Sequence, residues 1–159
     1  MHLYKDTLIK TDHGTIPINL LKEGYKVMCF DGKYRNISSI NVIQDNYIFD
    51  IILSDKEIVH LGDGSNILIR TLDDIKNRIS DELNKIIGVN ENTLKRYEFI
   101  CYRDSWDSMI RNTHIQYNHN YLLQCEDFYS IALDNLSSNS IDNMICVKFN
   151  NSDKTIFVS

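Results

Sequence analysis

Three side chains in the carboxy-terminal half of the chain have the chemistry of metal ligands. They are His114, His119 and Cys125, and imidazole nitrogen and thiolate sulfur are donors that zinc prefers. Structural zinc sites combine four such ligands at short, regular spacings, whereas these three match no standard pattern and lack a fourth. The sequence therefore predicts no metal site and no cofactor.

The four cysteines are the most reactive nucleophiles of the chain. They are Cys29, Cys101, Cys125 and Cys146, which lie far apart and form no C-x-x-C pair. This spacing argues against the disulfide framework of a secreted protein and favours reduced thiols in a cytosol. We expect each cysteine to be a small, buried apolar group.

Composition excludes several classes of function. The 159 residues are 43% hydrophobic, enough for one domain with a core. The net charge is −5 and no block of Lys or Arg stands out, so no nucleic-acid surface is expected. No apolar run has the length of a membrane span, and residues 1–12 lack the apolar segment of a secretory signal. A protein partner and a cytoplasmic location fit these features best.

The elements that would position such side chains are best seen in residues 7–70. Apolar residues there recur mostly at every second position, the period of β-strands, between tight turns. Turns are predicted at Gly14, at Gly24 and at Asp31-Gly32, the last as a hairpin with a type I′ turn. Pro17 places the strand of residues 15–20 at an edge or bulge. The long run from residue 37 predicts a bend near residues 44–46.

This order of strands and turns resembles the Hint fold shared by inteins and hedgehog-type autoprocessing domains. The residues that carry the resemblance are Thr7-Leu8-Ile9, Gly14, the Ile16-x-Ile18-x-x-Leu21 run, Gly24, Val27 and Asp31-Gly32. The resemblance covers residues 1–70, under half of the chain. It implies a mainly β (α+β) fold whose long strands bend into a horseshoe.

The chain departs from the family at the residues that do chemistry. A reactive Hint domain has Cys or Ser just before the threonine-led strand, and that side chain attacks the preceding carbonyl. His2 stands at this place with only Met1 before it, and an imidazole cannot form the ester.

The second departure concerns the family motif T-x-x-H, whose imidazole polarises the scissile amide. The similar residues here are Asp63-Gly64-Ser65-Asn66, so Asn66, or Ser65 after a shift of one residue, takes the histidine position. Neither side chain shuttles protons near neutral pH. Tyr25 also follows Gly24 where the family usually has Asp. These departures predict that the fold was kept and the reaction lost, which leaves no catalytic residue.

His119-Asn120 is an alternative site of chemistry that the resemblance implies. Inteins end in His-Asn, where the asparagine cyclises and cleaves the chain. Here Tyr121 follows in place of Cys, Ser or Thr, and the preceding residues are only loosely apolar. We interpret the pair as a coincidence in an Asn-rich chain and keep it as the cleavage pair of the alternative hypothesis.

Residues 71–97 have a different period and predict a short helical insert. Apolar residues recur at spacings of three and four, the pattern of one helix face, at Leu72, Ile75, Ile79, Leu83, Ile86 and Ile87. Thr71 would cap this helix and Gly88 would end it. A second short helix is expected from Asn90 or Asn92. The insert is too short for a homing endonuclease of the kind found at this place in Hint proteins.

Residues 98–159 are expected to complete the same domain. They predict a strand at residues 97–102, a helical turn with a buried Trp106 at residues 104–111, and a terminal hairpin of residues 143–149 and 154–158. Residues 124–134 fit both strand and helix, and the sequence does not decide between them.

The leading hypothesis is a non-catalytic Hint-like module for protein interaction or structure. The bias toward Asn, Ile, Lys and Asp fits an AT-rich coding sequence, such as that of a phage, and a phage virion component in particular. Two alternatives are a self-cleaving or splicing element that uses His119-Asn120 or a recruited thiol such as Cys29, and a small phage inhibitor of a host protein. The expected partners are virion or host proteins, and the expected location is the host cytoplasm or the virion.

Overall fold

The described residues of the computed structural model form antiparallel β-strands almost throughout. The model describes residues 1–52, 56–71, 85–88, 97–99, 116–134, 143–149 and 155–159. Their elements are β1 (Leu3–Tyr4), β2 (Leu8–Thr11), β3 (Gly14–Pro17), the 3-10 helix η1 (Ile18–Leu20), β4 (Lys26–Met28), β5 (Tyr34–Ile52), β6 (Ile58–Gly62), β7 (Asn66–Thr71), β8 (Lys85–Gly88), β9 (Tyr97–Phe99), β10 (Gln116–Leu133), β11 (Ile145–Lys148) and β12 (Thr155–Val158). Hydrogen-bonded neighbours follow the order β10-β1-β6-β5-β4-β2-β11-β12-β7-β8, with β3 on β2 and β9 on β7.

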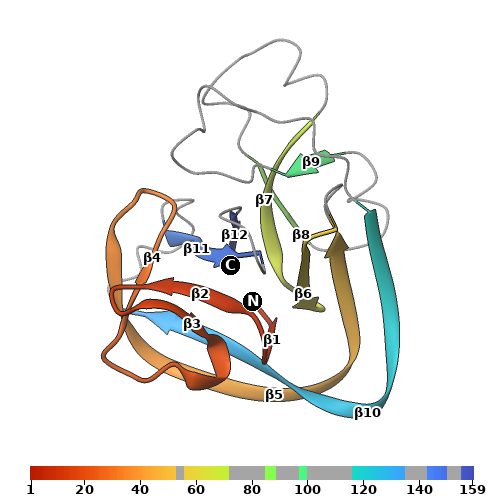
Figure 1. Cartoon of the computed structure of the whole chain (residues 1–159), viewed down its shortest axis with the longest axis horizontal. Coiled ribbons are helices and arrows are strands. Elements are labelled where there is room, and N and C mark those ends of the chain that lie inside the picture. Colours follow the sequence, from red (N-terminus) through yellow and green to blue (C-terminus); the bar gives the residue numbers. More distant parts are fainter. Residues whose placement is uncertain (53–55, 72–84, 89–96, 100–115, 135–142, 150–154) are drawn as a thin grey trace.

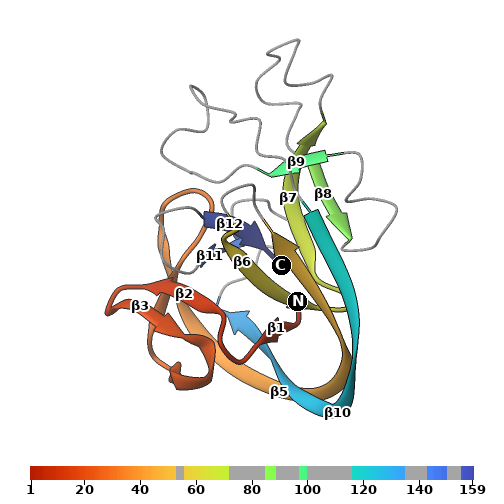
Figure 2. The ribbon, with the colours of Figure 1, turned by 45° about the vertical axis from the view of Figure 1, so that its right-hand side comes forward.

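Two long strands, β5 and β10, bend together around the outside of the fold. They run side by side along the lower edge and up one flank of the molecule (Figures 1 and 2). Their register shifts between the pairs Tyr47↔Tyr121 and Asp45↔Glu126, so residues 122–125 of β10 stand opposite Asn46 alone. Extra residues on one strand bend it and increase its twist. The mainly β horseshoe and the bend predicted near residues 44–46 are therefore confirmed.

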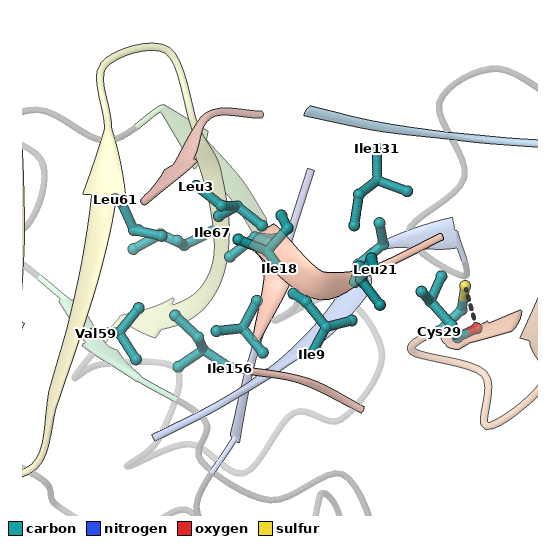
Figure 3. Close-up of a cluster of buried hydrophobic side chains, with 14 of the residues drawn as sticks. Leu3, Ile9, Ile18, Leu21, Cys29, Val59, Leu61, Ile67, Ile131 and Ile156 are labelled. Carbon is teal, nitrogen blue, oxygen red and sulfur yellow. Dashed lines mark hydrogen bonds between the residues drawn. The ribbon is translucent and has the colours of Figure 1, made fainter. Parts of the chain in front are cut away.

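The core lies inside this curve and follows the two-residue period of the strands. Figure 3 shows Leu3, Ile9 and Ile18 converging on side chains from β6, β7 and β12. In β11 and β12 successive side chains are buried on both faces: Val147 and Ile156 join the main cluster, whereas Cys146 and Phe157 join a second one. Both faces of this terminal hairpin are covered, as expected of strands with continuous apolar runs. The predicted hairpin of residues 143–149 and 154–158 is confirmed.

In the first third of the chain the predicted turns are confirmed, but the predicted turn type at residues 31–32 and the predicted strand of residues 15–20 need correction. Gly14, Gly24 and Gly32 have positive φ, and β3 with Pro17 is an edge strand paired with β2 alone among the described strands. The predicted type I′ turn is wrong, because Asp31 does not share the positive φ of Gly32. Gly32 N donates to Cys29 O and Cys29 N to Lys33 O, which makes a longer loop with one left-handed residue.

The second correction concerns residues 15–20, which do not continue as one strand. The chain leaves β3 after Pro17 and turns through η1, so Ile18 is buried while Leu20 is exposed.

The predicted helix of residues 71–87 is wrong at its described residues. Thr71 ends β7, and Ile86 and Ile87 belong to β8, where they pair with Leu68 and Ile67. An isoleucine-rich segment satisfies helix and strand patterns alike, and here the pairing with β7 decides. Residues 72–84 and 89–96, with the second predicted helix, lie outside the described residues. The division into residues 1–70, 71–97 and 98–159 stays a prediction.

Further toward the carboxy terminus, the open choice at residues 124–134 is settled as strand, because β10 extends to Leu133. The predicted strand near residue 97 is confirmed for β9, whereas Trp106 lies outside the described residues. Cys29 and Cys146 are buried as expected, but Cys125 is exposed, because the bulge in β10 holds it away from the core. Within the described ranges, no helix is long and apolar enough to cross a membrane.

Candidate functional site

Residues near both ends of the chain meet at the turn between β6 and β7. Gly62 N donates a 2.7 Å hydrogen bond to His2 O at the amino-terminal side. At the other side Asn66 and Ser159 exchange backbone hydrogen bonds of 2.8 and 3.0 Å. The N and C labels lie close together in Figures 1 and 2. We call residues 2, 62–66 and 159 the junction site.

Ser65 is the side chain that contacts the backbone of His2. Its hydroxyl accepts a 2.9 Å hydrogen bond from His2 N and donates a 2.7 Å hydrogen bond to His2 O. The side chain is fully buried. His2 N is the amide nitrogen of the Met1–His2 peptide bond, so a neutral hydroxyl lies against the bond that corresponds to the scissile one of the resemblance.

The imidazole of His2 is turned away from Ser65. Its Nδ1 lies 2.6 Å from the carbonyl oxygen of Asp63, which can only accept, so Nδ1 carries the proton of this contact. Gly64, with a φ of +83°, lets the turn bring that carbonyl under the ring. The His2 side chain thus contacts the carbonyl of the turn between β6 and β7, and among the described residues no hydrogen bond joins it to the Met1–His2 peptide bond.

Gly62 allows the first residues to approach β6 closely. A Cβ atom at this position would lie 2.7 Å from His2 Cβ and 2.9 Å from Phe128 Cδ1. Real Cβ contacts are longer than this, so any side chain at Gly62 would displace His2 or the buried Phe128. Glycine at position 62 therefore allows His2 to pack closely against the turn.

The site residues predicted from the sequence are only partly brought together. His2, Ser65 and Asn66 meet at the junction, where Ser65 has the side-chain contact and Asn66 pairs through its backbone with Ser159. His119 and Asn120 lie elsewhere, in the middle of β10, where they pair with Phe49 and Ile48 of β5. The His119 ring stacks on Phe49 at 4.4 Å.

Asn120 belongs to a second polar cluster, which the sequence did not predict. His60 Nδ1 donates to Asp50 Oδ1 at 2.5 Å, and its Nε2 lies 3.7 Å from Asp6 Oδ2. Asn120 Nδ2 donates to the other oxygen of Asp50 at 2.9 Å. Asp50 and His60 are directly opposed across the β5–β6 hairpin, so correct placement of that hairpin would have revealed the pair.

The three side chains with the chemistry of metal ligands, His114, His119 and Cys125, are not gathered into a site where the structure describes them. His114 lies outside the described residues, and Cys125 Sγ donates to Asn46 Oδ1 at the bulge. Among the described residues, no group of three or more His, Cys, Asp or Glu side chains is placed to hold a metal ion.

Comparison with known proteins finds solved structures of similar fold, but no match among protein families or curated proteins. No protein-family model and no curated protein matches the sequence. Among solved structures, the chain is similar to the bacterial intein-like domain from Clostridium thermocellum, with a TM-score of 0.66 at 10% identity over 99% of this chain and 98% of that one.

Two inteins show the same likeness. The AceL NrdHF class 3 split intein has a TM-score of 0.68 at 11% identity and covers 98% of this chain and 96% of its own. The gp41-1 intein has a TM-score of 0.56 at 14% identity over 94% and 98%. Identities this low show the fold alone, but the coverage extends the resemblance of residues 1–70 to nearly the whole chain. The chain therefore has an intein-like Hint fold.

Proposed function

We propose that this chain is a non-catalytic Hint-like module that acts through protein interaction or as a structural component. The observation that carries the proposal is the pair of hydrogen bonds between the Ser65 hydroxyl and the backbone of His2. These contacts support a structural role for Ser65 beside the peptide bond at which self-cleavage would need a nucleophile and a proton-transfer group.

The chemistry of the junction supports this proposal. Acyl transfer needs a thiol or hydroxyl activated by a base within hydrogen-bond reach. The imidazole of His2 cannot form an ester and is bonded to the Asp63 carbonyl. The Ser65 hydroxyl donates its hydrogen bond to His2 O, and a carbonyl oxygen at this place cannot act as the base that deprotonates the hydroxyl.

Self-cleavage at His119-Asn120 is the less favoured alternative. Cyclisation of an asparagine requires its side-chain nitrogen to reach its own carbonyl carbon. Asn120 Nδ2 instead donates to Asp50, and its backbone is paired with Ile48 in a regular stretch of the β5–β10 ladder. The exposed Cys125 and the buried Cys29 lie outside the junction site. For Cys29, burial raises the pKa of the thiol and disfavours the thiolate.

Intact mass tests this proposal directly. The purified chain is incubated for days with a thiol and, separately, with hydroxylamine, which cleaves esters and thioesters. We expect one full-length species in both samples. Fragments ending at residue 120, or a thiol-dependent break anywhere in the chain, would support the autoprocessing alternative and contradict the proposal.

The biological setting of such a module is a further part of the proposal. The coding bias noted above fits a phage protein, either a virion component or an inhibitor of a host protein. A virion component would be found in stoichiometric amounts in purified particles. An inhibitor would be absent from particles and would capture one host protein in a salt-sensitive manner.

A further inference from the structure

The bent ribbon of β5 and β10 contains a stretch that leaves the sheet. Residues 121–127 of β10 and 44–47 of β5 lie opposite each other and, among the described strands, pair with no third strand. We call these residues the arm. Figures 1 and 2 show this part of the ribbon along the outer curve of the molecule. Two strands alone are marginally stable in water, and their free edges can accept another strand.

The arm exposes large apolar side chains. Tyr121 is 65% exposed, Leu123 96% and Tyr47 43%, and Val42 and Ile43 are exposed beside them. Val42 and Ile43 lie next to the arm in β5, and because neighbouring residues of a strand point to opposite faces, they extend the apolar surface on both faces of the ribbon. Exposed groups of this size gathered on one element mark an interaction surface.

A row of aromatic side chains leads from the core onto the arm. The His119 ring stacks on the buried Phe49, Tyr47 lies 5.3 Å from His119, and Tyr121 lies 5.3 Å from Tyr47, all between ring centroids. The row thus begins in the core and becomes more exposed toward Tyr121. Aromatic side chains held in place before binding lose little entropy on binding.

Charge indicates what the arm would bind. No Lys or Arg occurs in residues 36–52 or in β10, whereas Asp45, Glu126 and Asp127 lie on the arm. Among the described residues, Lys5 reaches the arm, and its Nζ lies 3.3 Å from Glu126 Oε2. A second copy of the chain would bring the same carboxylates and a net charge of −5 against this surface, which disfavours a dimer.

From these contacts we infer that the arm binds an extended, basic segment of another protein as an added strand. The segment alternates Lys or Arg with aliphatic or aromatic residues. Its backbone pairs with the free edge of the arm, its apolar side chains lie on Tyr121 and Leu123, and its cations meet the acidic residues. This inference rests on the proposed function, since it gives the interaction module a surface and a partner class.

Two matched peptides test the inference. One is a ten-residue blocked peptide that alternates Lys with Val, and the other has Glu in place of each Lys. Each is added to the full chain while backbone amide NMR signals and amide hydrogen exchange are followed. We expect the Lys peptide to shift and protect amides of residues 121–127, and ~0.5 M salt to weaken its binding. The Glu peptide should not bind.

Substitutions on the arm locate the binding. Tyr121→Ser and Leu123→Ser should each weaken the Lys peptide by about tenfold or more, as expected for central contacts of an interface. Tyr34→Ser and Leu20→Ser remove exposed side chains of the same types outside the arm and should leave binding unchanged.

Several results would overturn the inference: no binding of the Lys peptide, equal binding of both peptides, or binding that the arm variants leave intact. Protection of the arm that grows with protein concentration alone would show a second copy as the occupant and would also overturn it. Self-cleavage in the mass experiment would instead contradict the proposed function, but it would not contradict the binding of a basic peptide by the arm.

Discussion

The Ser65 side chain holds the backbone of His2 by hydrogen bonds. Its buried hydroxyl makes two hydrogen bonds to one residue, His2, and both partners are backbone groups. A buried backbone group left without its partner costs about 1–3 kcal/mol. At this scale the junction is a structural contact, and stability measurements on single substitutions should show it.

We expect Ser65→Ala to lower the free energy of unfolding by about 1–3 kcal/mol, because the His2 amide would lose its hydrogen-bond partner, while the His2 carbonyl would keep the Gly62 N–H as its partner. Urea unfolding followed by circular dichroism gives this value. Ser38→Ala is the matched control, since the exposed Ser38 hydroxyl also bonds a backbone carbonyl, that of Ala132. The control should lose less than about 0.5 kcal/mol. Equal losses in the two variants would contradict the structural role of Ser65.

Gly62→Ala tests the close approach of His2 to β6. The added Cβ would overlap His2 Cβ and the ring of Phe128, so we expect a loss of about 2–3 kcal/mol. Gly14→Ala is the control, because Gly14 has positive φ but no atom within 4 Å of an added Cβ. It should lose about 1 kcal/mol from backbone strain alone. A Gly62 variant as stable as the Gly14 variant would show that His2 moves freely.

At the scale of elements, the β4–β5 hairpin is held by an ion pair. Arg35 donates to both carboxylate oxygens of Asp31, at 2.8 and 2.7 Å. These hydrogen bonds, with help from the Lys33 backbone N–H, lower the pKa of Asp31 from 3.8 to about 2. Because the folded-state pKa lies below that of the unfolded chain, the pair stabilises the fold above about pH 4. This stabilisation is lost as the pH falls toward 2.

Asp31→Asn should therefore cost about 1–2 kcal/mol of unfolding free energy at pH 7, and the difference from the wild type should vanish near pH 2. Urea unfolding at a series of pH values measures this. Asp134→Asn changes the net charge equally at an exposed turn and should show no such dependence. A pH-independent cost at Asp31 would mean that the charge of the carboxylate contributes nothing.

The sequence predicted the elements that depend on local rules. Alternating apolar residues placed β2 and β4, continuous apolar runs placed β11 and β12, which are buried on both faces, and glycine marked the turns at Gly14 and Gly32. The bend near residue 45 followed from the length of one apolar run. At the junction, the resemblance singled out His2 and residues 63–66 as matches to two family motifs.

What the sequence could not predict depends on contacts between distant segments. Ile86 and Ile87 fit a helix face as well as a strand, and the pairing with Ile67 and Leu68 decided for strand. Ser65 and Asn66 are both candidates for the histidine position, and the sequence could not predict that Ser65 contacts His2 through its side chain whereas Asn66 pairs with Ser159 through its backbone. The Asp50–His60 pair required the register of β5 and β6.

At the scale of the whole molecule, the fold is kept at 10–14% identity to the solved structures. This is understandable because a β core needs apolar residues at alternate positions and glycine at sharp turns, which many sequences supply. The chemistry of a Hint domain has no such tolerance, since it needs a particular atom at a particular place. Fold and reaction can therefore separate, and function must be argued from the site.

Release of a leader peptide tests the loss of chemistry most directly. A short peptide is fused before Met1, and the mass of the fusion is followed in thiol and in hydroxylamine for the wild type and for Ser65→Ala. We predict that both proteins keep the leader. Release from the wild type at Met1–His2, abolished in the Ser65 variant, would show that the buried hydroxyl is a nucleophile and would contradict a module without a reaction.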